Sequence, residues 1–207
     1  MAMEEHARQA LADVGREFYT RGWMLATAGN LSCRLGDDRY TITASGGHKG
    51  RLTTADFINF KLGMQSEEPH RRSSAETVVH DELYARLGDR AGAILHVHAP
   101  WLTLVSRLHA GAGEVRFEAW EYIKALGFWG EGDVAVVPIV PNHADLHRLG
   151  VAVRDAAGAT PAVLVNGHGV YAWGTSIADA QRHIEATEFL CQLEWETQRM
   201  RTRGSVH

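Results

Sequence analysis

The stretch Ala93-Ile94-Leu95-His96-Val97-His98 is apolar except for its two histidines. A short run of this kind predicts a buried β-strand. Successive side chains of a strand point to opposite faces, so the imidazoles of His96 and His98 project to the same face. Paired histidines on a strand also occur without a ligand, but two buried imidazoles are costly unless they have a partner. The stretch therefore predicts a core strand that carries part of a metal site.

A third histidine stands in the turn Gly167-His168-Gly169, between two further apolar runs. The flanking glycines add no side-chain bulk and let the backbone bend around an ion. Catalytic zinc sites commonly use three protein ligands, which leaves one position for water or substrate. We therefore expect His96, His98 and His168 to hold one Zn²⁺ per subunit. Imidazole sites also accept iron, cobalt, nickel or manganese, so the identity of the metal stays open.

Helical and strand patterns alternate along the whole chain. The expected helices cover residues 4–20, 73–87, 101–108, 119–126, 145–156 and 177–199. The expected strands cover residues 31–35, 40–43, 57–62, 93–98, 134–140, 162–165 and 170–173, the first two joined by a turn at 36–38. Ser73 and Glu76 have the spacing of a capping box, which places a helix start at Ser73. Residues 1–207 show no repeat, linker or composition break, so we expect a single α/β domain with sheet and helices in layers.

The composition narrows the class of protein. The chain has 207 residues, of which 45% are hydrophobic and 22% charged, as is ordinary for a soluble globular protein. Its net charge of -4 argues against nucleic acid as a partner, and no apolar run is long enough for a membrane span. Cys33 and Cys191 show no CxxC spacing and no signal peptide is visible, so a cytoplasmic location is expected.

Three glutamates are candidates for proton transfer. Glu121 stands among aromatic residues in the stretch 117–122, and desolvation there would raise its pKa toward the range of a proton shuttle. Glu118 competes for the same role. Glu76 is ambiguous, because the capping-box spacing already gives it a structural task. Most glutamates at a helix start are solvated, so the sequence pattern alone does not decide which of the three transfers protons.

Small residues on predicted loops are candidates for binding phosphate. Loops and helix starts of this kind present backbone N–H groups and hydroxyls to anions. Each loop by itself is typical of an ordinary turn, but three of them accompany the histidine cluster. The candidates are Gly29, Asn30, Ser45, Gly46, Ser73 and Ser74, with His48 and Lys49 adding positive charge.

Five of these stretches occur in an order that resembles the class II aldolase/adducin family over nearly the whole chain. The matching stretches are Thr27–Ser32, Ile42–Gly46, Ser73–Thr77, His96–His98 and Gly167–Val170. The resemblance implies a central, mostly antiparallel sheet flanked by helices, and zinc on the three histidines. It also implies a cytoplasmic homotetramer with sites near the subunit interfaces, in which Glu121 is the catalytic acid/base. Some members carry cysteine where this chain has Glu76, whereas in the aldolases a carboxylate there is catalytic. The division of labour between Glu76 and Glu121 is therefore open.

Stretches 48–50, 121–124 and 168–174 are most similar to members that act in methionine salvage. The activity implied is a lyase that removes water from 5-methylthioribulose 1-phosphate, giving 2,3-diketo-5-methylthiopentyl 1-phosphate through a metal-stabilised enediolate. The alternative is an aldolase that cleaves a ketose 1-phosphate such as fuculose 1-phosphate. Sugar-phosphate aldolases often contribute a tyrosine from the C-terminal tail, and no tyrosine follows Tyr171 here. A non-catalytic, adducin-type interaction module would not need three convergent histidines.

Overall fold

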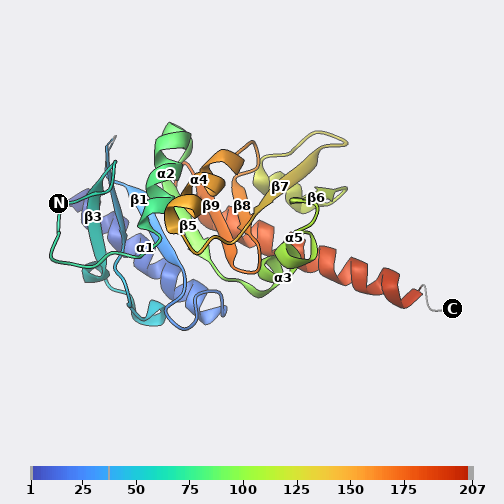
Figure 1. Ribbon diagram of the computed structural model, residues 1–207, viewed down its shortest axis with the longest axis horizontal. Helices are drawn as coiled ribbons and strands as arrows, with labels where there is room; N and C mark the ends of the chain where they lie inside the picture. Colours follow the sequence, from blue (N-terminus) through green and yellow to red (C-terminus); the bar gives the residue numbers. More distant parts are fainter. Residues whose placement is uncertain (1, 37, 205–207) are drawn as a thin grey trace.

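The computed structural model describes residues 2–36 and 38–204 (Figure 1). The α-helices of this part are α1 Ala2–Thr20, α2 Thr77–Leu87, α3 Pro100–Leu108, α4 Leu146–Ala156 and α5 Ile177–Gly204. The strands are β1 Asn30–Arg34, β2 Arg39–Thr43, β3 Phe57–Lys61, β4 Gln65–Ser66, β5 Ala93–Val97, β6 Glu114–Glu118, β7 Val134–Val140, β8 Ala162–Val165 and β9 Gly169–Gly174. Short 3-10 helices are η1 Lys49–Arg51, η2 Thr54–Asp56, η3 Gly88–Arg90 and η4 Glu121–Leu126.

The strands of the described residues form one nine-stranded sheet in the order β4-β3-β2-β1-β5-β9-β8-β7-β6. Neighbouring strands run antiparallel except β7 and β8, which are parallel. The predicted hairpin of β1 and β2 is present, although Asp37 in its turn lies outside the described residues. The histidine-bearing strand β5 lies in the middle of the sheet, between β1 and β9.

The two faces of the sheet are covered by different helices. One core packs α1, α3 and α5 against the sheet and includes Leu95 and Val97 of β5. The other packs α2 and α4 against the opposite face and includes Ile94. Because side chains alternate along a strand, His96 faces the side of α2 and α4. The layered α/β/α fold with a mostly antiparallel sheet is therefore confirmed. Figure 1 also shows α5 extending beyond the sheet toward the C-terminus.

Two local predictions are wrong, and two strands, β4 and β6, were not predicted. Helix α2 begins at Thr77 rather than Ser73, and the side chain of Glu76 makes no capping hydrogen bond, because Ser73 instead pairs with Ala44 in an isolated β-bridge. The segment 119–126 forms the 3-10 helix η4 from Glu121, and Ala119 before it has a φ of 59°. Strand β6 was not expected, although its alternation of buried Val115 and Phe117 with exposed residues is typical of an edge strand.

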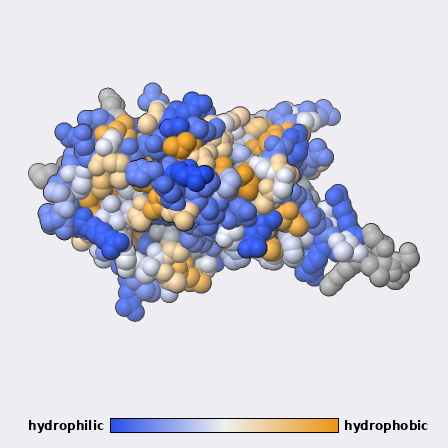
Figure 2. Space-filling model, viewed as in Figure 1, coloured by the Kyte–Doolittle hydropathy of each residue, from blue (hydrophilic) through white to orange (hydrophobic). Residues whose placement is uncertain are grey.

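The surface drawn in Figure 2 is mostly polar, with apolar residues scattered among charged ones. Among residues 2–36 and 38–204, no helix combines the length and apolar character that crossing a membrane requires. Cys33 and Cys191 are both buried, and they form no disulfide with each other. Burial raises the pKa of the Cys33 thiol to about 12, which makes it an unreactive part of the core.

Candidate functional site

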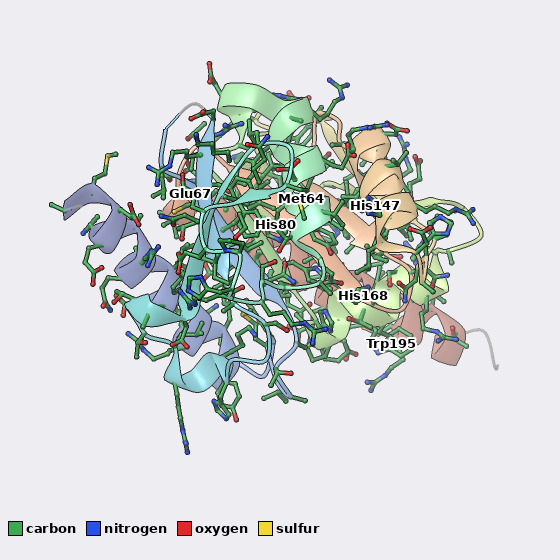
Figure 3. The ribbon with its side chains drawn as sticks, turned by 60° about the vertical axis from the view of Figure 1, so that its left-hand side comes forward. Met64, Glu67, His80, His147, His168 and Trp195 are labelled. Carbon is green, nitrogen blue, oxygen red and sulfur yellow. The ribbon has the colours of Figure 1, made fainter. Side chains whose placement is uncertain are left out.

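The structure brings the three predicted histidines together. His96 comes from β5, His98 follows that strand directly, and His168 lies in the turn between β8 and β9 (Figure 3). Antiparallel pairing of β5 with β9 carries the turn alongside the paired histidines. One ring nitrogen from each histidine lies within 4.8 Å of the other two. The cluster is thus made by strand pairing between segments that are distant in the sequence.

Glycines let the backbone approach the cluster closely. A Cβ atom on Gly169 would lie 2.2 Å from the carbonyl oxygen of Val97 and 3.1 Å from Cδ2 of His98. At Gly29, which has a φ of 76°, a Cβ atom would lie 2.6 Å from the carbonyl oxygen of His96. Both distances are too short for any side chain, so the two glycines permit the packing that positions the imidazoles.

Helix α3 holds the turn that carries His168. The hydroxyl of Ser106 accepts from the N–H of Gly167 at 2.9 Å, and the hydroxyl of Thr103, which donates to the carbonyl oxygen of Ala99 at 2.8 Å, lies 3.2 Å from the carbonyl oxygen of His168. The helix is anchored in turn by Glu188 of α5, whose carboxylate accepts from the N–H groups of Trp101 and Leu102 at 3.1 and 2.8 Å. The third imidazole is therefore fixed through two layers of hydrogen bonds.

The environment keeps two of the imidazoles neutral. His96 is fully buried and its ring stacks on Tyr171, with ring centroids 4.1 Å apart. Its Nδ1–H donates to the carbonyl oxygen of Val170 at 2.9 Å, which leaves the lone pair on Nε2 facing the cluster. Burial, together with the neighbouring imidazoles, lowers the pKa of His96 and of His98 to about 3. Neutral imidazole is the form that binds a metal.

Glu76 also faces the cluster. Its Oε2 atom lies 3.4 Å from Nε2 of His96, and its Oε1 atom lies 3.3 Å from Nε2 of His168. Nε2 of His98 lies 2.9 Å from Nε2 of His96. A carboxylate and three imidazole rings thus bring their nitrogen and oxygen atoms together at short distances, an arrangement that a divalent cation stabilises. Three imidazole nitrogens match the donor set of a metal site, so the residues present fit a cation.

The predicted phosphate loops lie side by side next to Glu76. Nδ2 of Asn30 is 3.1 Å from the hydroxyl of Ser74, and it also donates to Oε2 of Glu76 at 2.6 Å. The N–H of Ser45 donates to the carbonyl oxygen of Arg72 at 2.9 Å, next to the bridge between Ala44 and Ser73. Ser45 and Gly46 are exposed, and Gly46 has a φ of 77°, as its turn requires. Asn30 and Ser74 thus meet beside Glu76, and the loop of Ser45 adjoins them through the bridge between Ala44 and Ser73.

The two predicted basic residues lie in different surroundings. Lys49 is only 2% exposed, and its Nζ donates to the carbonyl oxygens of Thr27 and Gly47 at 2.9 and 3.2 Å. Burial lowers the pKa of Lys49, while the charge of Asp56 acts in the opposite direction. His48 is exposed and its ring contacts Tyr19, with centroids 4.6 Å apart. Of the pair, Lys49 is the residue whose charge is directed inward.

Glu121 lies outside the cluster formed by this chain. Its side chain is 79% exposed and forms an ion pair with Lys124 at 2.7 Å. The expected desolvation by nearby aromatic residues is therefore absent within one chain. Glu121 lines a cavity of about 360 Å³ with Trp120 and Phe128, and none of the three histidines lines that cavity. Glu118 is exposed at the end of β6.

Two site residues were missed by sequence reasoning. The ring of Tyr171 stacks on His96, and Nε2 of His80 forms a hydrogen bond with Oδ1 of Asn30. A signal for His80 was available, because Glu76, His80 and Tyr84 follow at intervals of four and so share one face of α2. Tyr171 follows His168 in a buried strand and carried no comparable signal.

Several known proteins are similar to this chain in sequence or in fold. The class II aldolase and adducin N-terminal domain matches residues 9–195. The methylthioribulose-1-phosphate dehydratase of Methylococcus capsulatus is 44% identical over 188 residues, which cover 89% of this chain and 90% of that protein. The protein of the same name from Geobacillus kaustophilus is 40% identical, covering 92% of this chain and 90% of its own length.

Among solved structures, the L-fuculose-1-phosphate aldolase of Thermus thermophilus superposes with a TM-score of 0.78. It is 26% identical, and the match covers 97% of this chain and 98% of that one. The family match spans most of the chain, and the relatives cover nearly all of it at about 40% identity. The chain therefore belongs to the class II aldolase and adducin family.

Proposed function

We propose that the chain is a zinc-dependent methylthioribulose-1-phosphate dehydratase. The observation that carries the proposal is the convergence of His96, His98 and His168 beside the carboxylate of Glu76. Relatives that bear this name are 39–44% identical over about nine-tenths of the chain. The reaction converts 5-methylthioribulose 1-phosphate into 2,3-diketo-5-methylthiopentyl 1-phosphate and water, a step of methionine salvage.

The three histidines would hold the cation. A divalent ion at this position supplies Lewis acidity, which polarises a substrate carbonyl and favours negative charge on its oxygen. Zinc is our choice because neutral imidazoles are its usual ligands in catalytic sites. Tyr171 and the carbonyl of Val170 keep the ring of His96 in the orientation and tautomer that this role requires.

The converging loops would bind the substrate phosphate. The Lys49 ammonium has three N–H donors, and carbonyl oxygens take two of them, which leaves one for an anion. The hydroxyls of Ser45, Ser73 and Ser74 and the backbone around Gly29, Asn30 and Gly46 add neutral donors, and His48 stands at the exposed edge. Anchoring the phosphate here fixes the reacting carbons relative to Glu76.

Glutamates would move the protons. A base takes the proton from C3 of the substrate, and the C4 hydroxyl accepts a proton and leaves as water. The resulting enol tautomerises, placing a solvent-derived hydrogen on C4 and yielding the diketone. Glu76 is positioned for one of these transfers within its own chain.

Glu121 would serve the site of a neighbouring subunit. Its exposed carboxylate is accompanied by exposed aromatic side chains, Tyr122 at 50% and Trp129 at 72%, which a partner chain would cover. We place residues 1–207 in one domain of a cytoplasmic homotetramer whose sites lie near subunit interfaces. The buried, unpaired thiols of Cys33 and Cys191 fit a reducing compartment.

The test compares metal content with turnover. Purified protein is stripped with a chelator and reloaded with zinc, and the diketone phosphate is measured before and after. We expect stoichiometric zinc and activity that returns on reloading. His168→Ala should lose at least about 100-fold in zinc affinity, since even supporting residues of metal ligands contribute 10- to 100-fold. His147→Ala on the exposed face of α4 is the matched control (Figure 3). Stoichiometric zinc in His168→Ala would refute the site.

A further inference from the structure

A chain of hydrogen-bonded side chains leads from Glu76 into the space between α2 and the sheet. Nδ2 of Asn30 donates to Oε2 of Glu76 at 2.6 Å, and Oδ1 of Asn30 bonds to Nε2 of His80. Nδ1 of His80 lies 2.7 Å from the hydroxyl of Ser32, which lies 2.8 Å from the hydroxyl of Tyr84. Asn30, Ser32, His80 and Tyr84 are each at most 2% exposed, so water does not compete for these bonds.

The amide of Asn30 gives the direction of the bonds in this chain. The NH₂ group of Asn30 donates to Oε2 of Glu76, so the amide turns its oxygen to His80. That oxygen only accepts, so Nε2 of His80 carries the proton.

The remaining directions follow from the single proton of a neutral imidazole. Burial lowers the pKa of His80 to about 3, so its Nδ1 is bare and accepts from Ser32. With its hydrogen used, Ser32 accepts from the phenol of Tyr84. The carbonyl oxygen of Ile94, at 3.4 Å, is a poorer acceptor for the Ser32 hydroxyl than Nδ1.

We propose that His80 is a positioning residue, which locks the amide of Asn30 so that its NH₂ group orients the carboxylate of Glu76 toward the histidine cluster. The same NH₂ group lies 3.1 Å from the hydroxyl of Ser74, so one amide sets both the acid/base residue and a phosphate loop. Without a donor from His80, the buried oxygen of Asn30 loses its partner, so the amide is held on one side only and no longer fixes the position of the carboxylate. The catalytic consequence of this inference rests on the proposed function. The positions of the protons along the chain of bonds do not depend on it.

The first test uses substitutions that separate the two nitrogens of His80. The amide of His80→Gln reaches the position of Nε2 and can still donate to Asn30. The shorter His80→Asn reaches only the position of Nδ1, and His80→Leu keeps the volume without either bond. We expect kcat to fall about 10- to 100-fold in His80→Asn and His80→Leu, as for other supporting residues, and to recover largely in His80→Gln. Zinc content should stay at the wild-type level in all three.

Tyr84→Phe provides a control at the far end of the chain of bonds. It removes a hydroxyl but leaves the bonds from Ser32 to Glu76 in place, so kcat should change less than in His80→Asn. If His80 served folding alone, its variants would lose stability but kcat would not rank His80→Gln above His80→Asn. Urea unfolding of each variant measures that loss of stability.

The second test reads the proton directly in the wild-type protein. Nitrogen-15 NMR of histidine-labelled protein distinguishes protonated from bare ring nitrogens, and the His80 signals are those missing from His80→Gln. We expect a proton on Nε2 and a bare Nδ1. A proton on Nδ1, or equal kcat in the Gln, Asn and Leu variants, would overturn the inference. If the wild-type enzyme does not dehydrate the substrate, the proposed function fails, while the NMR result still decides the direction of the bonds.

Discussion

Oε1 of Glu76 lies 3.3 Å from Nε2 of His168, so a carboxylate at the start of α2 faces an imidazole from the turn between β8 and β9. The side chain of Glu76 is 16% exposed and also reaches His96. A cation held by the imidazoles would therefore have a proton acceptor beside it within the same chain. This contact makes Glu76 a functional candidate rather than a helix cap.

Replacing Glu76 with glutamine tests that role. Glu76→Gln keeps the shape of the side chain and removes the proton acceptor, so we expect turnover to fall about 100- to 10,000-fold, the usual contribution of an acid/base group. Zinc content should remain stoichiometric, because the three histidines are unchanged. Glu82→Gln is the matched control, since Glu82 lies on the same helix and forms an ion pair with Arg154 instead. Equal activities in the two variants would exclude Glu76 from the chemistry.

Glu121 gives a prediction that depends on assembly. Glu121→Gln alone should lower turnover by a similar factor, whereas Glu118→Gln should not. Coexpression of Glu121→Gln with His168→Ala should restore activity, because mixed oligomers combine an intact metal site with an intact Glu121 from another subunit. Purified mixed oligomers that remain inactive would place Glu121 and the histidines in separate functions.

Local sequence patterns predicted the parts of the site that depend on neighbours in the chain. The alternation around His96 and His98 predicted their strand and their common face, and the glycines around His168 predicted a tight turn. What the pattern could not supply is the strand order, because the pairing of β5 with β9 joins segments that are distant in the sequence.

The wrong predictions also involve contacts that the local sequence pattern does not contain. Ser73 and Glu76 fit a capping box, but tertiary contacts with Ala44 and Asn30 engage them, so the helix begins later. The aromatic residues around Glu121 predicted burial, yet one chain leaves that carboxylate in solvent. Patterns within a helix or strand identify its type and face, whereas partners across the fold decide what a polar residue does.

The turn that carries His168 should tolerate no side chain at its second glycine. Gly169→Ala would place a Cβ atom 2.2 Å from the carbonyl oxygen of Val97, and relieving that clash must move β9 or β5. We expect a loss of roughly 1–3 kcal/mol in the free energy of unfolding, as for other overpacked sites, together with weaker zinc binding. Gly111→Ala, where a Cβ atom meets nothing within 4 Å, should change stability by less than about 0.5 kcal/mol. Urea unfolding and metal titration of both variants check this, and matching results would contradict the packing described.

Glu188 predicts a pH dependence of stability. Burial raises the pKa of this carboxyl to about 7, although the N–H groups of Leu102 and Trp101 act in the opposite direction. A raised pKa means that the folded protein binds the proton more tightly than the unfolded chain. The stabilisation is therefore complete below about 4.5 and is lost as the pH rises through about 7, a change of about 3 kcal/mol at most.

Glu188→Gln removes this titration. The free energy of unfolding of the metal-stripped variant should decline less between pH 4.5 and 7 than that of the metal-stripped wild type. Contributions from the histidines are common to both proteins and cancel in the comparison. Parallel curves for the two proteins would show that Glu188 does not titrate in this range.

The most direct measurement follows the carbon skeleton of 5-methylthioribulose 1-phosphate in deuterated water. The zinc-loaded enzyme should yield one product that has lost a single water, keeps all its carbon atoms and carries solvent deuterium on C4. Release of dihydroxyacetone phosphate with an aldehyde would identify an aldolase instead. Recovery of unchanged substrate from protein with stoichiometric zinc would also contradict the assignment.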